Sequence, residues 1–193
     1  MQLPFLTAEE AAAYIEHGDI LGIGGFGPAG SPKMIPPALA KRAMAEHEAG
    51  RPFKVDVITG ASIATSCDGA LTLADAIDRR MPFSVNTDVR RAFNAGKVRY
   101  TDLNLSDNAT HLRQGMTGPI TWGIIEAIDV QKICGKSEST LRRGLVLHQL
   151  CVVWLKKAYS SSGTCGTRQA LSDFMTSMRL KILGIAVPWA SIA

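Results

Sequence analysis

The chain has 193 residues, of which 46% are hydrophobic and 20% are charged, and this composition suffices for one α/β core. Its 21 basic and 17 acidic residues give a formal net charge of +4, with the basic side chains scattered along the chain, which argues against nucleic-acid binding. No apolar run reaches the ~18 residues that span a bilayer, and the N-terminus lacks the pattern of a signal peptide. We therefore expect a cytoplasmic protein, or an organellar one without its address, that binds neither nucleic acid nor membrane.

The cysteines give no sign of a metal centre. They are spaced irregularly, at Cys67, Cys134, Cys151 and Cys165. None forms a CxxC pair or stands near a partner histidine, so neither a zinc site nor a disulfide framework is expected. The sequence predicts no metal and no permanently bound cofactor.

The first elements are a helix and a strand. Thr7 and Glu10 have the spacing of a capping box, which predicts a helix start, and Gly18 is placed to end that helix in a left-handed conformation. Residues 20–23 then read as a short buried strand. It runs into a glycine-rich segment at residues 24–30.

Helices and strands continue to alternate after this segment. Pro32 stands at a helix start, and apolar residues follow it at helical spacing as far as Met44. The later elements are a strand at 53–59, a helix at 68–78, a strand at 98–103, a helix at 106–115 and a strand at 122–126. This alternation predicts an α/β fold with a mainly parallel sheet and flanking helices, whose active loops leave the carboxyl ends of the strands.

The glycine-rich segment admits three interpretations. Gly22, Gly24 and Gly27 match a GxGxxG dinucleotide fingerprint, but residues 28–32 separate the last glycine from any helix. The acidic residue expected about 20 positions later is also missing from the end of the next strand. A plain structural turn is the second interpretation. In the third, exposed backbone N–H groups approach a substrate carbonyl or carboxylate and stabilise an oxyanion.

A longer motif favours the third interpretation. Residues 24–33 read GGFGPAGSPK and residues 36–42 read PPALAKR. Together they resemble the GFTPAGxPKxxPxALAKR signature of the acetyl-CoA hydrolase/transferase family, class I CoA-transferases of the succinyl-CoA:acetate CoA-transferase type. The resemblance implies the CoA-transferase N-terminal domain, with its NagB/RpiA-like fold, in a truncated form.

Further segments similar to the family follow in order as far as residue 130. They are TGAS at 59–62, DGA at 68–70, ADA at 74–76, Asn86 with Arg90 and Asn94, LS with LRxG between 105 and 115, and IIEA at 124–127. Thr110 stands where the family commonly has glutamine, so we leave it out of the site. Lys33, Arg90 and Arg113 could bind a carboxylate or CoA phosphates, or simply be solvated. Glu126 is expected to be a structural carboxylate at a strand end.

The resemblance also implies an activity. In the family, a glutamate carboxylate attacks an acyl-CoA thioester, forms a mixed anhydride and then a glutamyl-CoA thioester, and returns CoA to an acid such as acetate or succinate. Coenzyme A is then a substrate, acyl-CoA and small carboxylates are the partners, and a homodimer is one assembly that the resemblance allows. The predicted acyl-facing loop consists of Gly24, Gly25, Phe26, Gly27 and Gly30.

The character of the chain changes after about residue 130. Helix and strand periods fade, and no family motif continues in the printed frame. Read one nucleotide upstream, residues 174–192 can encode FHDVYEAEDPGNRRAMGI and residues 148–157 can encode SPTLCRMAEK, both similar to downstream segments of the family. We infer a single frameshift near residues 129–132, natural or from sequencing, which makes residues 131–193 an out-of-frame tail.

Two hypotheses follow for the whole chain. In the first, it is a CoA-transferase or hydrolase by descent, with residues 1–130 forming the N-terminal α/β domain. In the second, it is a non-catalytic remnant. Under both, no catalytic residue lies in this chain, because the family's glutamate is expected beyond the frame break. The chain as written is therefore expected to be inactive.

Overall fold

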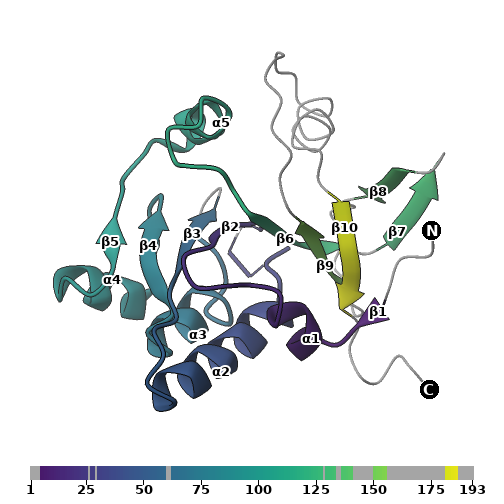
Figure 1. Ribbon diagram of the computed structural model, residues 1–193. Helices are drawn as coiled ribbons and strands as arrows, with labels where there is room; N and C mark the ends of the chain where they lie inside the picture. The colour runs from purple at the N-terminus through teal and green to yellow at the C-terminus, as the bar shows by residue number, and fades with distance from the viewer. Residues whose placement is uncertain are drawn as a thin grey trace.

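The computed structural model describes residues 5–25, 27–28, 30–59, 62–127, 129–133, 136–140, 150–155 and 181–186. Its centre is a set of parallel strands in the order β6-β2-β3-β4-β5 (Figure 1). Their bounds are Ile20–Ile23 for β2, Val55–Thr59 for β3, Ile77–Met81 for β4, Arg99–Tyr100 for β5 and Trp122–Ala127 for β6. The predicted α/β fold with a mainly parallel sheet is confirmed.

The helices lie in two places relative to this sheet. They are α1 (Ala8–Ala12), α2 (Ile35–Glu48), α3 (Asp68–Leu73), α4 (Thr87–Asn94) and α5 (Leu105–Arg113). The first four form a row in which each helix contacts the next. α5 stands apart from that row, at the end of the sheet toward which β3 and β4 run (Figure 1).

The two faces of the sheet are covered unequally. Alternate residues of β2 and β3, such as Leu21 and Val57, join a large core with α1, α2, α3 and part of α4. The opposite face carries a small cluster of Ile58, Met81 and Ile120, against which partly buried side chains such as Leu112 of α5 pack. One face therefore supplies most of the buried apolar area, and the carboxyl ends of the strands are left to loops.

The start of α1 agrees with the sequence, and its end does not. Thr7 accepts a hydrogen bond from the Glu10 amide at 3.1 Å, and the Glu10 carboxylate accepts one from the Thr7 amide at 2.7 Å, which confirms the capping box. Gly18 has the expected positive φ of +86°. The helix nevertheless ends at Ala12, so Gly18 serves a separate turn, in which its amide donates to the Lys54 carbonyl at 2.8 Å.

The predicted helix at 68–78 is wrong in its second half. α3 ends at Leu73, and Ile77–Met81 forms the strand β4 between β3 and β5. The helix ends in a Schellman motif, in which the Ala76 amide donates to the Leu71 carbonyl at 2.9 Å and Asp75 takes φ +50°. Helices α2, α4 and α5 end in the same motif, but each has a glycine at the position that Asp75 occupies after α3. Because α3 uses an aspartate there, the sequence carries no stop signal.

Helix α4 was not predicted. Its N-cap is Asn86, whose side chain accepts hydrogen bonds from the amides of Asp88 at 2.9 Å and Val89 at 3.2 Å. Its buried residues Val89 and Ala92 are three apart, and Gly96 follows at φ +67°. The cap, the spacing and the glycine together were a signal that could have found this short helix.

Additional strands extend the sheet beyond β6. β9 (Leu150–Leu155) pairs with β6 in antiparallel fashion, β10 (Lys181–Ala186) pairs with β9, and β1 (Phe5–Leu6) pairs with β10. β7 (Asp129–Ile133) and β8 (Lys136–Thr140) form a separate two-stranded sheet. Strand pairing uses backbone groups that every sequence carries, and an open sheet edge is a template for apolar segments. These pairings are thus compatible with an out-of-frame tail.

Candidate functional site

The loop after β2 leaves the sheet where its strand order reverses. β2 lies between β3 and β6, so the chain moves to one side of β2 first and returns on its other side much later. In open parallel sheets, the crevice at such a switch point, outside the carboxyl ends of the strands, is where ligands bind. We call residues 24–30 the glycine loop; its described residues are 24–25, 27–28 and 30.

The glycine loop folds back on itself. Gly25 has φ +121°, and a Cβ on it would lie 2.7 Å from Ser31 Cα and 2.8 Å from the Gly30 carbonyl oxygen. Gly30 also has a positive φ, of +68°. The close approach that requires glycine at position 25 is therefore between two parts of the loop itself, and it gives the loop a closed, compact path.

Two backbone amides of the predicted acyl-facing set are engaged within the fold. The Gly24 amide donates to the Ile124 carbonyl at 2.9 Å, and the Gly27 amide donates to the Ser62 carbonyl at 2.7 Å. A Cβ on Gly24 would also lie 3.1 Å from Ile125 Cγ2, so this glycine packs tightly against β6. Phe26 lies outside the described residues. The loop can thus shape one wall of a site, but these two N–H groups are not free to bind an oxyanion.

The dinucleotide interpretation fails on the same geometry. A phosphate-binding fingerprint needs a helix that opens directly at the third glycine, so that its N-terminal N–H groups face the phosphates. Here α2 begins at Ile35, well beyond Gly27, and the amide of Gly27 is bonded to Ser62. Gly22 has a packing role as well, because a Cβ on it would lie 3.0 Å from Ile120 Cδ1.

Replacing Gly25 by alanine is expected to destabilise the chain more than the same change at Gly27. A Cβ on Gly25 would collide with backbone atoms that have to move, at a cost of about 2–3 kcal/mol. A Cβ on Gly27 meets no heavy atom within 4 Å, so only its positive φ of +56° is strained, at about 1 kcal/mol. Urea unfolding of the two variants measures the difference, and equal losses would contradict the closed loop.

An ion pair crosses the switch point. Lys33 Nζ lies 2.8 Å from Glu126 Oε1 at the carboxyl end of β6, and it also donates to the Ser31 carbonyl at 3.2 Å. The Glu126 side chain is 10% exposed and that of Lys33 is 34% exposed. The prediction that Glu126 is a structural strand-end carboxylate fits this geometry, because the glutamate fixes Lys33 and ties the loop to β6.

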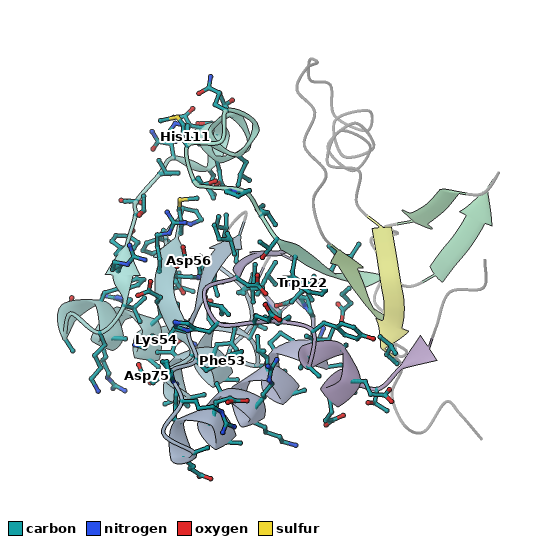
Figure 2. All side chains as sticks on the ribbon, in the orientation of Figure 1. Phe53, Lys54, Asp56, Asp75, His111 and Trp122 are labelled. Carbon is teal, nitrogen blue, oxygen red and sulfur yellow. The ribbon has the colours of Figure 1, made fainter. Side chains whose placement is uncertain are left out.

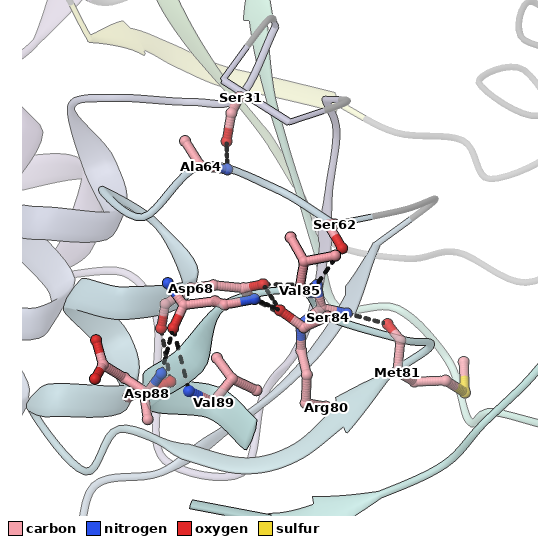
Figure 3. A network of polar contacts seen from close by, with 12 residues as sticks. Ser31, Ser62, Ala64, Asp68, Arg80, Met81, Ser84, Val85, Asp88 and Val89 are labelled. Atoms are coloured by element: carbon pink, nitrogen blue, oxygen red, sulfur yellow. Dashed lines mark hydrogen bonds and ion pairs between the residues drawn. The ribbon is translucent and has the colours of Figure 1, made fainter. Parts of the chain in front are cut away.

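A buried polar network underlies the neighbouring loops (Figure 3). The Arg80 guanidinium on β4 donates two hydrogen bonds of 2.9 Å to the Asp68 carboxylate on α3, and both side chains are 0% exposed. Ser84 Oγ donates to the same carboxylate at 2.7 Å, and Arg80 donates to the Met81 carbonyl at 2.7 Å. The network therefore fixes the start of the β4–α4 loop. Sequence reasoning had named Asp68 only as part of a motif and had missed Arg80 and Ser84.

The loops after β2, β3 and β4 leave the same end of the sheet, because these strands are parallel. Figure 2 shows His111, on α5, at the opposite end of the sheet from Lys54 and Asp75. Lys54 Nζ donates to the Asp75 carboxylate at 3.1 Å, an ion pair near the start of β3 and far from the glycine loop. The loops that could meet a ligand thus gather at one end of the molecule.

Comparison with known proteins settles the family. The model of the acetyl-CoA hydrolase/transferase N-terminal domain matches residues 3–135. The chain belongs to this family. It is 43% identical over 122 residues to a propanoyl-CoA:succinate CoA transferase of Escherichia coli K12, covering 63% of this chain and 25% of that protein. It is 38% identical over 130 residues to a succinyl-CoA:acetate CoA-transferase of Clostridium kluyveri, covering 67% of this chain and 24% of that protein.

The chain spans about a quarter of the length of these curated relatives of the family. It is also similar to a solved structure, an acyl-CoA transferase from Escherichia coli O157:H7 in a thioester complex with CoA. That similarity has a TM-score of 0.49 and 14% sequence identity, and covers 70% of this chain and 31% of the other.

Two of the family segments named from the sequence fall on α4 and α5. Asn86 caps α4, and Arg90 lies exposed on that helix. Arg113 ends α5, and its side chain lies outside the described residues. Asn108 of α5 was missed: it is buried, and its Nδ2 donates to the Thr59 carbonyl at the end of β3 at 2.7 Å. The asparagine thus holds α5 against the same edge of the sheet.

The two shifted pKa values that can be assigned to a carboxyl and a phenol belong to residues away from the glycine loop. The hydrogen bond from Arg51 lowers the pKa of Glu46, at the end of α2, and burial raises the pKa of Tyr100, on the edge strand β5. Among the described residues, no group of three or more His, Cys, Asp or Glu side chains could hold a metal ion. None of the described helices is long and apolar enough to cross a membrane.

Proposed function

We propose that this chain is the N-terminal part of an enzyme that moves CoA between an acyl-CoA and a small carboxylate, with acetate and succinate as the expected acids. The observation that carries the proposal is the family match over residues 3–135, which contains the whole glycine loop and its supports. The named relatives, transferases of propanoyl-CoA and succinyl-CoA and an acetyl-CoA hydrolase of Schizosaccharomyces pombe, favour this substrate class.

The proposed reaction passes through a glutamyl-CoA thioester, with the nucleophilic glutamate supplied from outside this chain's in-frame residues. We assign to Gly24, Gly25, Phe26, Gly27 and Gly30 the wall that faces the acyl or carboxylate group. The closed path of the loop, at a switch point of a parallel sheet, supports this role. The wall acts through its shape, because the Gly24 and Gly27 amides are already bonded within the fold.

Lys33 adds a hydrogen-bond donor to that wall. An ammonium group has three N–H donors, and two acceptors, Glu126 Oε1 and the Ser31 carbonyl, are in place. The remaining N–H of this one-third exposed side chain is the group we assign to an oxygen of the carboxylate or of CoA. Because Glu126 balances the charge, Lys33 offers a directed donor with little net charge.

The second candidate is a non-catalytic remnant. It rests on the two out-of-frame runs in residues 148–157 and 174–192, which resemble downstream parts of the family when read one nucleotide upstream. We accordingly divide the chain into a domain at residues 1–130 and an out-of-frame tail at residues 131–193, and we propose that the chain as written is inactive. A cytoplasmic location and a homodimer of the intact enzyme stay predictions.

An assay of CoA transfer from acetyl-CoA to succinate tests the proposed function. It uses the protein with its reading frame restored near codon 130. The reaction is monitored by the loss of acetyl-CoA and the appearance of succinyl-CoA. Formation of succinyl-CoA supports the proposal. A folded, frame-restored protein that transfers CoA to neither succinate nor propionate, and hydrolyses no acetyl-CoA, overturns it.

A further inference from the structure

The glycine loop is bound to the segment that follows β3. The Gly27 amide donates to the Ser62 carbonyl at 2.7 Å, and Gly27 forms a parallel β-bridge with Ile63. Farther along, the Ala64 amide donates to Ser31 Oγ at 3.2 Å. Residues 62–64 therefore run beside the loop and are bonded to Gly27 within it and to Ser31 directly after it, so the position of the loop depends on that of Ser62.

Ser62 has a second bond, through its side chain. Its Oγ accepts a hydrogen bond from the Val85 amide at 2.9 Å (Figure 3). Val85 belongs to the loop between β4 and α4, so Ser62 joins the loops that follow β2, β3 and β4. Its carbonyl bonds one loop and its hydroxyl bonds the other.

The far end of this connection is rigid. Val85 stands between Ser84, whose Oγ donates to the buried Asp68 carboxylate at 2.7 Å, and Asn86, whose amide donates to Ser84 Oγ at 3.2 Å. Asp68 is itself held by the two hydrogen bonds from the buried Arg80. Buried, fully bonded networks of this kind allow little local motion. The Val85 amide is thus a fixed point from which Ser62 can be held.

We propose that Ser62 is a positioning residue, which holds the glycine loop in its ligand-facing conformation by tying it to the Asp68–Arg80–Ser84 network. The inference rests on the proposed function of the loop, but the connection itself is a property of the fold. It assigns to one hydroxyl the role of linking the most deeply buried ion pair of the described residues to the wall of the site.

The test is amide hydrogen exchange, measured by NMR on the 193-residue chain and on its Ser62→Ala variant. The change removes the acceptor of Val85 and leaves the Ser62 carbonyl in place for Gly27. We expect the amides of both Val85 and Gly27 to exchange about fivefold faster or more, since one lost hydrogen bond changes a local opening equilibrium by about that factor. Amides of α2, which lie outside this connection, should exchange at their original rates.

Two further variants make the result specific. Ser62→Thr keeps the hydroxyl and should restore the exchange rates of both amides. Ser106→Ala, which removes an exposed hydroxyl on α5 that donates to the neighbouring Asp107, should leave them unchanged. Unchanged exchange of Gly27 in Ser62→Ala overturns the proposal, and so does a uniform acceleration that includes α2. Because no CoA chemistry is measured, failure of the proposed enzyme activity and failure of this connection are distinguishable.

Discussion

The 193-residue chain is expected to show no CoA transfer from acetyl-CoA or succinyl-CoA and no thioester hydrolysis above background. In the proposed mechanism the glycine loop faces charge that develops only when a carboxylate nucleophile attacks the thioester. In that mechanism, the loop and Lys33 without the nucleophile bind part of a substrate and do not turn it over. Loss of the nucleophile from a covalent catalytic set lowers the rate by more than about 10³-fold.

The matched comparison is between this chain and the frame-restored protein at equal concentration, with acetyl-CoA plus succinate and with acetyl-CoA alone. Loss of thioester absorbance follows hydrolysis, and separation of the CoA esters follows transfer. We expect turnover in the frame-restored protein and none in the 193-residue chain. Robust turnover by the 193-residue chain would show that its own residues include the nucleophile, against the proposed division at residue 130.

Replacing Asp68 by alanine is expected to lower the free energy of unfolding by about 3–5 kcal/mol. The change leaves the Arg80 guanidinium charged, 0% exposed and without the carboxylate that accepts two of its hydrogen bonds. It also removes the acceptor of the Ser84 hydroxyl. A loss of this size is a large fraction of the stability of a small domain, so the variant should unfold at much lower urea concentrations.

Asp88→Ala is the matched control for that measurement. It removes an aspartate whose carboxylate lies 3.2 Å from the guanidinium of Arg91, a side chain that is 80% exposed. Exposed pairs of this kind contribute about 0–1 kcal/mol to the free energy of unfolding. A double replacement, Asp68→Leu with Arg80→Met, should recover much of the stability, because apolar residues need no partner in a buried position. A loss below about 1 kcal/mol for Asp68→Ala alone would contradict the buried pair.

The sequence predicted the central strands where apolar residues dominate them, and failed at β4, in which three consecutive residues are charged. Ile20–Ile23 and Val55–Thr59 were predicted within two residues, because buried parallel strands read as apolar runs. β4 reads Ile-Asp-Arg-Arg-Met, and the charge of its buried Arg80 is paired with Asp68, twelve residues earlier, on the far side of a turn. That pairing depends on the tertiary fold, so no local pattern could indicate it.

The geometry of the candidate site could be predicted only in part, because it too depends on contacts set by the tertiary fold. The glycine loop and its place after β2 follow from the motif, and the importance of Gly25 follows from its residue type. The contacts around Gly25 and Gly27 could not be predicted from the motif. Ser31 approaches Gly25 and Ser62 bonds to Gly27 because of the path that the loop takes in the folded chain. Nothing in the sequence distinguishes Ser62 as a connecting residue. Its role follows from the structure, in which its carbonyl and its hydroxyl bond two different loops.

The most direct measurement for the central claim is the nucleotide sequence of the gene around codons 125–135 and downstream. The claim is that in-frame residues of the acetyl-CoA hydrolase/transferase family end near residue 130. A one-nucleotide correction there should open a reading frame that continues for hundreds of residues, passes through the shifted runs at 148–157 and 174–192, and includes the family's glutamate. A stop codon soon after the corrected junction, in a confirmed sequence, would contradict the intact-enzyme account.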